Sequence, residues 1–234
     1  MKNISHLTFI ATLAAGLSAA AAGDITGTIT LKGTPPPEKD ITPLKEDATC
    51  GKLHTTMPVT RWYVVGAKGE LADVVIYLKG VTGKSTGASA PPVIIDQKGC
   101  EYIPSIVAAQ TGQKITVKNS DPVLHNVHTT PTGNGNKEEN KAQMPGGADL
   151  NFSFPTAENF LRFKCDVHPW MFAWVTVVDS PYYAVSAKDG SFKIANVPPG
   201  KYTLEAVHRK LGTVTKDVEV TGDGAKADLT LEVK

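Results

Sequence analysis

The chain has 234 residues, with 24 lysines and arginines against 23 aspartates and glutamates, and a formal net charge of +1. Hydrophobic residues make up 41% of the chain and charged residues 20%, which is the composition of a folded globular protein. Such a balanced charge gives no support for nucleic-acid binding, which usually needs a strongly basic surface. The length suits two domains of ordinary size.

The first 22 residues have the pattern of a secretory signal peptide. A single lysine, Lys2, precedes an apolar stretch that ends in alanines at residues 20–22, and such small residues are typical of a cleavage site. The stretch is too short and too weakly apolar to favour a retained membrane helix. We therefore expect a mature protein that starts at Gly23, lies in the periplasm or outside the cell, and has no membrane span.

Short segments rich in β-branched and aromatic residues, separated by glycine and proline, follow one another along most of the chain. Residues 113–119 and 160–164 alternate as strands do, and residues 172–178 are rich in valine and aromatic residues. No long amphipathic helix is found, so we predict an all-β fold. Residues 131–149 are polar and rich in glycine and asparagine, and we expect them to form a long surface loop.

A metal-binding pattern lies between the last two of these strands. Cys165, His168 and Met171 stand within seven residues, and Pro169 fits the turn that would bring them together. His125 follows the first strand. A thiolate, two imidazoles and a thioether are the ligand set of a mononuclear blue-copper centre, whose chemistry is electron transfer. Cysteine and methionine are also common core residues, so simple packing is the alternative for each of them alone.

Residues 91–179 resemble the cupredoxins, the family of type 1 blue-copper proteins, and in particular the amicyanin and plastocyanin type. The resemblance implies a Greek-key β-sandwich that binds one type 1 copper ion. It implies that Cys165, His125 and His168 are the equatorial ligands of that ion. It also makes Met171 the axial ligand.

The resemblance extends to residues beside the ligands. It implies that Asn126 ties the two ligand loops together, the kind of outer contact that orients a metal site. The ligand loop departs from the amicyanins at Asp166 and Val167, where they carry Thr-Pro. His128 lies three residues after His125, so a regular strand would turn it to the other face. We therefore expect His128 to be structural.

The chain has three cysteines. If copper takes Cys165, then Cys50 and Cys100 remain as a pair, and in an oxidising compartment we expect them to form a disulfide. The alternatives are two free buried thiols, or a separate metal site that uses Cys50 with His54.

A second pattern lies near the C-terminus. Residues 189–204 give a turn, a strand, a Pro-Gly turn and another strand. They resemble the carboxypeptidase regulatory-like domain, a non-catalytic, transthyretin-type β-sandwich. The first two strands of that family are found much earlier in this chain, at residues 23–31 and 72–78.

We therefore predict one sandwich that is split by an insertion. Residues 23–90 and 181–234 would form it, and residues 91–180 would be the cupredoxin domain between them. Insertions between strands are tolerated because the ends of a surface loop lie close together. Two successive domains are the alternative.

The resemblance implies a periplasmic electron carrier that cycles between Cu(I) and Cu(II) and forms brief complexes with redox proteins as donor and acceptor. In cupredoxins the C-terminal histidine ligand commonly reaches the surface through an apolar patch, so electrons would pass through His168. The residues expected in that patch are Pro122, Val123, Pro169 and Trp170. The alternative is a protein that holds or delivers copper, or an extracytoplasmic interaction module, without electron-carrier turnover.

An enzymatic function is not expected. A copper oxidase or nitrite reductase needs further histidine-rich copper sites, and the mature chain has only His54, His128 and His208 besides the predicted ligands. The carboxypeptidase-like region lacks a zinc-binding His-x-x-Glu pattern, so its fold does not imply a peptidase.

Overall fold

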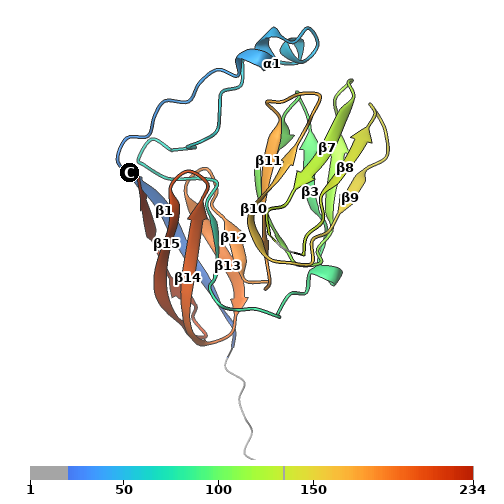
Figure 1. Ribbon diagram of the computed structural model, residues 1–234. Coiled ribbons are helices and arrows are strands. Elements are labelled where there is room, and N and C mark those ends of the chain that lie inside the picture. The colour runs from blue at the N-terminus through green and yellow to red at the C-terminus, as the bar shows by residue number, and fades with distance from the viewer. Residues whose placement is uncertain (1–20, 134, 234) are drawn as a thin grey trace, which may run out of the picture.

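The computed structural model describes residues 21–133 and 135–233. Nearly all of the regular structure is β-strand, which confirms the predicted fold class, and the strands form four sheets in two bodies that lie side by side (Figure 1). The expected signal peptide falls almost entirely outside the described residues. Within the described ranges, no helix is long and apolar enough to cross a membrane.

The first body combines strands from the beginning and the end of the chain. Its strands are β1 (Gly23–Lys32), β2 (Val75–Leu78), β12 (Tyr183–Val185), β13 (Ser191–Val197), β14 (Gly200–His208), β15 (Gly212–Val220), β16 (Ala225–Lys226) and β17 (Leu229–Glu232). β1 runs antiparallel to β13 and parallel to β16 and β17, and the facing sheet has the order β12-β2-β14-β15. Ile25, Ile29 and Ile194 are fully buried between the sheets, because alternate residues of a strand face the same side.

The second body is formed by the middle of the chain. Its strands are β3 (Val93–Gln97), β4 (Tyr102–Ile103), β5 (Ile106–Gln110), β6 (Ile115–Asn119), β7 (His125–Thr130), β8 (Glu139–Gln143), β9 (Leu150–Phe152), β10 (Glu158–Lys164) and β11 (Phe172–Val178). They form a sheet of order β5-β11-β10-β7-β8 and a sheet of order β4-β3-β6-β9. Leu161, Phe163 and Val127 are fully buried in the core of this body.

β8 corrects one expectation from the sequence. Residues 131–149 do not form only a loop, because Glu139–Gln143 pair with β7 as an edge strand. The strand escapes hydrophobic-pattern analysis because its residues are polar, and of these five only Gln143 is buried.

A long connecting segment, residues 33–74, joins β1 to β2. It leaves the first body and reaches one end of the second, where it forms α1 (Thr42–Glu46) and η1 (Cys50–Leu53) (Figure 1). Its two arms meet where the Thr60 amide donates to the Lys39 carbonyl at 2.8 Å. We call residues 39–60 the cap. Leu44 and Cys50 of the cap are fully buried in the core of the second body, so this part of residues 23–90 packs away from the sandwich strands.

The two bodies also touch along an apolar seam. Val75 and Val207 of the first body pack against Ile106 and Ala108 of the second, and all four are buried. The short η2 (Gly87–Ser89) lies in the connection from the first body into β3.

Candidate metal centre

The loop between β10 and β11 carries three of the predicted ligands. The Cys165 amide donates to the Met171 carbonyl at 3.1 Å, and the Met171 amide donates to the His168 carbonyl at 2.9 Å. These two hydrogen bonds close the loop into a tight turn. Cys165 and Met171 are each 1% exposed and His168 is 7% exposed. The turn therefore holds a thiol, an imidazole and a thioether-bearing residue at a buried position.

His125, the first residue of β7, approaches the same point from the neighbouring strand. Its Nδ1 lies 3.0 Å from His168 Nδ1 and 4.0 Å from Cys165 Sγ, and the distance between Cys165 Sγ and His168 Nδ1 is 3.7 Å. A point equidistant from the three atoms lies about 2.1 Å from each of them, and a metal such as zinc binds imidazole nitrogen and thiolate sulfur at about 2.0 to 2.3 Å. The three donors thus fit one metal ion of that size.

Asn126 connects the two loops that carry these donors. Its Oδ1 accepts hydrogen bonds from the amides of Asp166 at 2.7 Å and Val167 at 3.3 Å, and it lies 3.4 Å from Cys165 Sγ. Its Nδ2 donates to the carboxylate of Asp166 at 3.0 Å. The side chain thereby fixes the position of the thiol relative to β7.

The environment of the Cys165 thiol favours its ionised form. Burial opposes ionisation of Cys165, but hydrogen bonds from His125 and from nearby backbone amides outweigh burial, so the pKa of the thiol lies below its usual value. A thiolate is the form that binds a soft metal ion.

Asp121 is a part of the site that sequence analysis missed. Its Oδ2 lies 2.9 Å from His125 Nε2, and its two carboxylate oxygens accept hydrogen bonds from the amides of Gly99 at 2.6 Å and Cys100 at 2.7 Å. Burial raises the pKa of this carboxyl, but the hydrogen bonds from His125 and the two amides lower it by more. The pKa therefore lies below its usual value, and the group is held as a carboxylate. Its position four residues before a predicted histidine ligand, in a turn, is the signal that could have indicated it.

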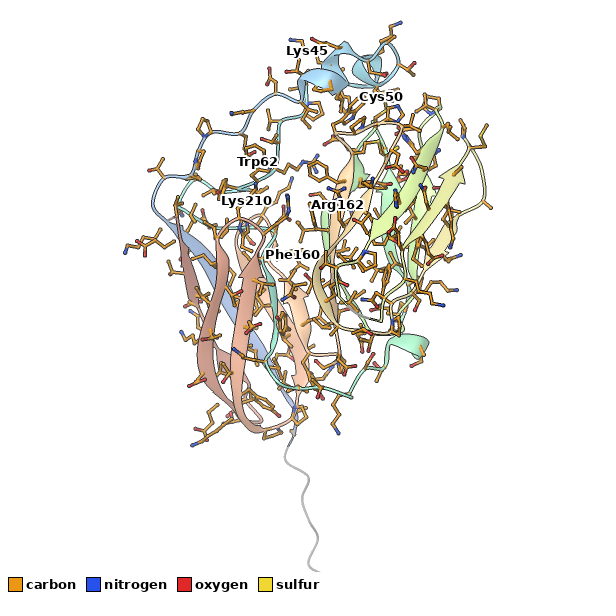
Figure 2. All side chains as sticks on the ribbon, in the orientation of Figure 1. Lys45, Cys50, Trp62, Phe160, Arg162 and Lys210 are labelled. Atoms are coloured by element: carbon orange, nitrogen blue, oxygen red, sulfur yellow. A yellow bond between two sulfur atoms is a disulfide. The ribbon has the colours of Figure 1, made fainter. Side chains whose placement is uncertain are left out.

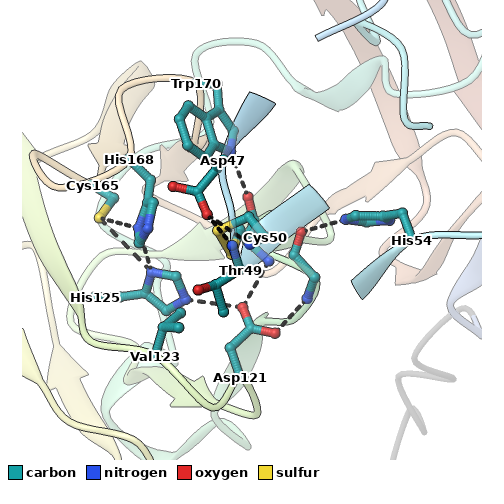
Figure 3. Close-up of a disulfide and its surroundings, with 12 residues drawn as sticks. Asp47, Thr49, Cys50, His54, Asp121, Val123, His125, Cys165, His168 and Trp170 are labelled. Atoms are coloured by element: carbon teal, nitrogen blue, oxygen red, sulfur yellow. Dashed lines mark hydrogen bonds and ion pairs between the residues drawn. A yellow bond between two sulfur atoms is a disulfide. The ribbon is translucent and has the colours of Figure 1, made fainter. Parts of the chain in front are cut away.

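The disulfide between Cys50 and Cys100 lies against the site, with an S–S distance of 2.08 Å (Figure 3). The two sulfur atoms and a ring nitrogen of His168 lie within 4.8 Å of one another. Trp170 Nε1 donates to the Cys100 carbonyl at 3.1 Å, and the Asp47 carboxylate accepts from the Cys50 amide at 2.7 Å. The cap is thus fastened beside His168 by one covalent bond, and His54 Nε2 of the cap also lies 2.6 Å from the Gly99 carbonyl oxygen.

This arrangement differs from the expected route to the surface. His168 is buried, whereas the resemblance implied that it reaches the surface. Of the four residues expected around it, Pro122 and Pro169 are exposed, while Val123 and Trp170 are partly buried and pack against the core of the second body. The physical reason is the cap, whose disulfide occupies the space next to the imidazole.

The other described histidines lie outside this cluster, each with its own partners. His54 Nε2 lies 2.6 Å from the Gly99 carbonyl oxygen, while Cys50 is in the disulfide, so the two do not form a metal site together. His128 Nδ1 lies 2.7 Å from an Asp166 oxygen, on the outer side of β7. His208 is buried in the first body.

No protein-family model matches the chain, and no curated protein matches it. Solved structures similar to part of the chain include a copper-containing nitrite reductase (NirK) from Thermus scotoductus SA-01, with 16% identity, a TM-score of 0.34 and coverage of 38% of this chain and 23% of that one. They also include an oxidised point mutant of amicyanin, with 17% identity, a TM-score of 0.34 and coverage of 44% and 97%.

A purple cupredoxin from Nitrosopumilus maritimus is similar as well, with 24% identity, a TM-score of 0.31 and coverage of 36% of this chain and 98% of that one. These structural neighbours are cupredoxins, and each of them is matched by less than half of this chain. The chain spans only about a quarter, 23%, of the length of the nitrite reductase.

Proposed function

We propose that the protein is a type 1 copper protein that carries single electrons between redox proteins. The observation that supports this most directly is the convergence of His125 Nδ1, His168 Nδ1 and Cys165 Sγ at mutual distances of 3.0 to 4.0 Å. Two imidazoles and one thiolate favour copper over the hard cations that prefer oxygen ligands. Bound copper would supply a reversible one-electron change of charge.

The surrounding residues would keep the donors still while the charge changes. Asp121 would hold His125 through Nε2 and so leave Nδ1 free for the metal, and Asn126 would hold the cysteine loop. Met171, buried in the same turn, would be the axial ligand. The four proposed ligands, His125, Cys165, His168 and Met171, are all buried, so water is kept away from them.

We propose that redox partners dock on the exposed apolar residues at this end of the second body. Leu124 is 38% exposed and Val167 is 51% exposed, and the exposed Pro122 and Pro169 each lie two residues from one of them. Small, apolar and mostly uncharged contact surfaces suit brief electron-transfer complexes. Because His168 is buried beside the cap, electrons would pass through these surface residues instead of through an exposed edge of the imidazole ring.

We further propose that residues 23–90 and 181–234 are one discontinuous carboxypeptidase regulatory-like sandwich around a cupredoxin domain of residues 91–180. The partners of β1 and β2 support this division, because the strands that pair with them in the described part of the chain all follow residue 181, while Thr30 also bridges to Glu70 of the same sandwich segment. Export to the periplasm fits the disulfide, because disulfides persist in oxidising compartments.

Copper storage or delivery is the second candidate, and burial of the donors behind the cap favours it. Voltammetry of the copper-loaded protein separates the two. An electron carrier gives a reversible one-electron couple and retains its copper over many cycles. A delivery protein gives up Cu(I) to a competing chelator on reduction. The variant Cys165→Ser serves as the control, since it should give neither signal.

A copper oxidase or nitrite reductase would need further histidine-rich copper sites, and the remaining described histidines do not gather into one. His54, His128 and His208, the remaining histidines among the described residues, are engaged separately by Gly99, Asp166 and the Lys210 amide. We propose that the protein is an electron carrier rather than an enzyme.

A further inference from the structure

A cavity of about 320 Å³ lies beside the metal centre, where the cap and the two bodies meet. Its walls come from distant parts of the chain, which include the arms of the cap, residues 101–106 at β4 and β5, the start of β11 and the turn after β14. Figure 2 shows Trp62, Arg162 and Lys210 in the space between the two bodies. The volume is at the lower end of the range usual for small-molecule sites, about 300 to 1,000 Å³.

Aromatic side chains form much of the wall. Those that line the cavity include Trp62, Trp170, Phe172 and Trp174. The guanidinium carbon of Arg209 lies 3.7 Å from the centroid of the Trp174 ring, and Lys210 Nζ lies 4.6 Å from a ring centroid of Trp62. Flat apolar surfaces with cations stacked on them are suited to a planar ring that carries negative charge.

Two hydrogen-bond donors in or beside the cavity wall lack a partner among the described residues. Arg162 stands directly opposite Trp174 on the neighbouring strand β10. Arg162 Nε and Trp174 Nε1 are both buried and without a hydrogen-bond acceptor in the described part of the chain. Nearly all buried donors in proteins are paired, so two orphan N–H groups at adjacent positions indicate a missing acceptor.

The positive charges here are also uncompensated. Within residues 21–133 and 135–233, neither Arg162, Arg209 nor Lys210 forms an ion pair with a carboxylate. Burial lowers the pKa of Arg209, and the nearby charge of Arg162 lowers it further. Two partly buried guanidinium groups that repel each other are a costly arrangement unless an anion joins them.

The acidic residues of the cavity lie elsewhere along its wall or are already paired. Glu101 is bound by Arg61 at 3.1 Å, and Asp40 is exposed. Burial raises the pKa of Asp73, and the charges that act on its carboxyl are those of Arg61 and Lys188 rather than Arg209. The cavity therefore has a cationic end at Trp174 and Arg209.

We propose that this cavity binds a small planar aromatic carboxylate. Its ring would lie among Trp62, Trp170 and Phe172, and its carboxylate would accept hydrogen bonds from Arg209 and Trp174 Nε1. Arg162 does not line the cavity, but it stands opposite Trp174 on the next strand, so its charge would add to the attraction. A guanidinium fork matches a carboxylate through two parallel hydrogen bonds, which gives both strength and orientation. Met171, the proposed axial ligand, also lines the cavity, but none of the residues proposed to contact the carboxylate is a copper donor, so the proposal does not depend on electron transfer.

Isothermal titration of the purified protein with 2-naphthoate tests the proposal. We expect saturable binding of one ligand per chain with a Kd below about 1 mM, and at least about tenfold weaker binding of the uncharged 2-naphthamide. Arg209→Gln should weaken 2-naphthoate binding by about tenfold or more, and Arg162→Gln should weaken it by less, because Arg162 acts only through its charge. Arg209→Lys should restore only part of the loss, because lysine lacks the fork. Lys201→Gln, at an exposed position of β14, is the matched control and should leave the affinity unchanged.

The folding of each variant is checked by its thermal unfolding curve, and Trp174→Phe supplies a second test that keeps the aromatic wall but removes the N–H donor. Absence of saturable binding, equal affinity for the acid and its amide, or unchanged affinity in both arginine variants would overturn the proposal. So would complete displacement of 2-naphthoate by chloride at equal concentration, because the site would then be one for simple inorganic anions.

Discussion

The carboxylate of Asp121 lies 2.9 Å from Nε2 of His125, while Nδ1 of the same ring lies 4.0 Å from the sulfur of Cys165. When a metal ion replaces the proton on Nδ1, the carboxylate would keep the remaining ring proton on Nε2, and it links that imidazole to the backbone of Gly99 and Cys100. The metal centre and the disulfide are thus joined through one side chain.

Removal of this link should weaken the site without removing a ligand. We expect Asp121→Ala to lower the affinity for copper by about 10- to 100-fold, the usual cost of losing a group that orients a histidine ligand. Asp121→Asn keeps one acceptor oxygen and should lose less. Competition with a chelator of known affinity measures both values, and equal affinities in the wild type and Asp121→Ala would contradict this role.

The disulfide should contribute strongly to stability, because it closes a long loop. Cys50 and Cys100 are 50 residues apart, and the chain-entropy model predicts a loss of about 4 kcal/mol in the free energy of unfolding when both are replaced by alanine. Urea denaturation of the double variant measures the loss, and the wild type reduced with a dithiol should show the same value. A loss below about 1 kcal/mol would show that the cap is held by its noncovalent contacts.

The proposed docking surface predicts a kinetic effect without a change at the metal. Val167 is 51% exposed beside the cysteine ligand, and Val167→Asp should slow electron exchange with a redox partner by about tenfold, since a charge in a small apolar contact must be desolvated. Ile94→Asp, at a 40% exposed position of β3, is the matched control. Stopped-flow kinetics with a cupredoxin-reducing partner would show equal slowing of both variants if Val167 has no special role.

His208 should make the first body sensitive to acid. Burial, with a further contribution from the charge of Arg209, lowers its pKa from 6.5 to about 4. Between these values the unfolded chain takes up a proton that the folded chain does not, so stability falls as the pH falls. The expected loss from this group is about 3 kcal/mol between pH 7 and pH 4.

The variant His208→Gln provides the comparison, since it cannot take up the proton. Its free energy of unfolding should fall less over the same range, by the amount that His208 contributes. Identical pH profiles for the two proteins would mean that the His208 proton is not linked to folding.

The sequence predicts the all-β class because strand patterns are local, and it predicts the cluster of Cys165, His168 and Met171 because these residues are neighbours in one turn. It could not predict the burial of His168, because Leu44 and Cys50 reach this place from more than a hundred residues earlier in the chain. Nothing in the periodicity of residues 33–74 indicates that they cross to the second body. The aromatic cavity was missed for the same reason, since its walls come from segments that are distant in the chain.

The most direct test of the proposed copper site is the visible absorption spectrum of the purified protein with one equivalent of Cu(II), beside that of Cys165→Ser. We expect an intense thiolate-to-copper charge-transfer band in the wild type, which a mild reductant bleaches reversibly and which is absent from the variant. A colourless wild-type protein, or a spectrum that is the same in Cys165→Ser, would contradict the assignment of Cys165 as a copper ligand.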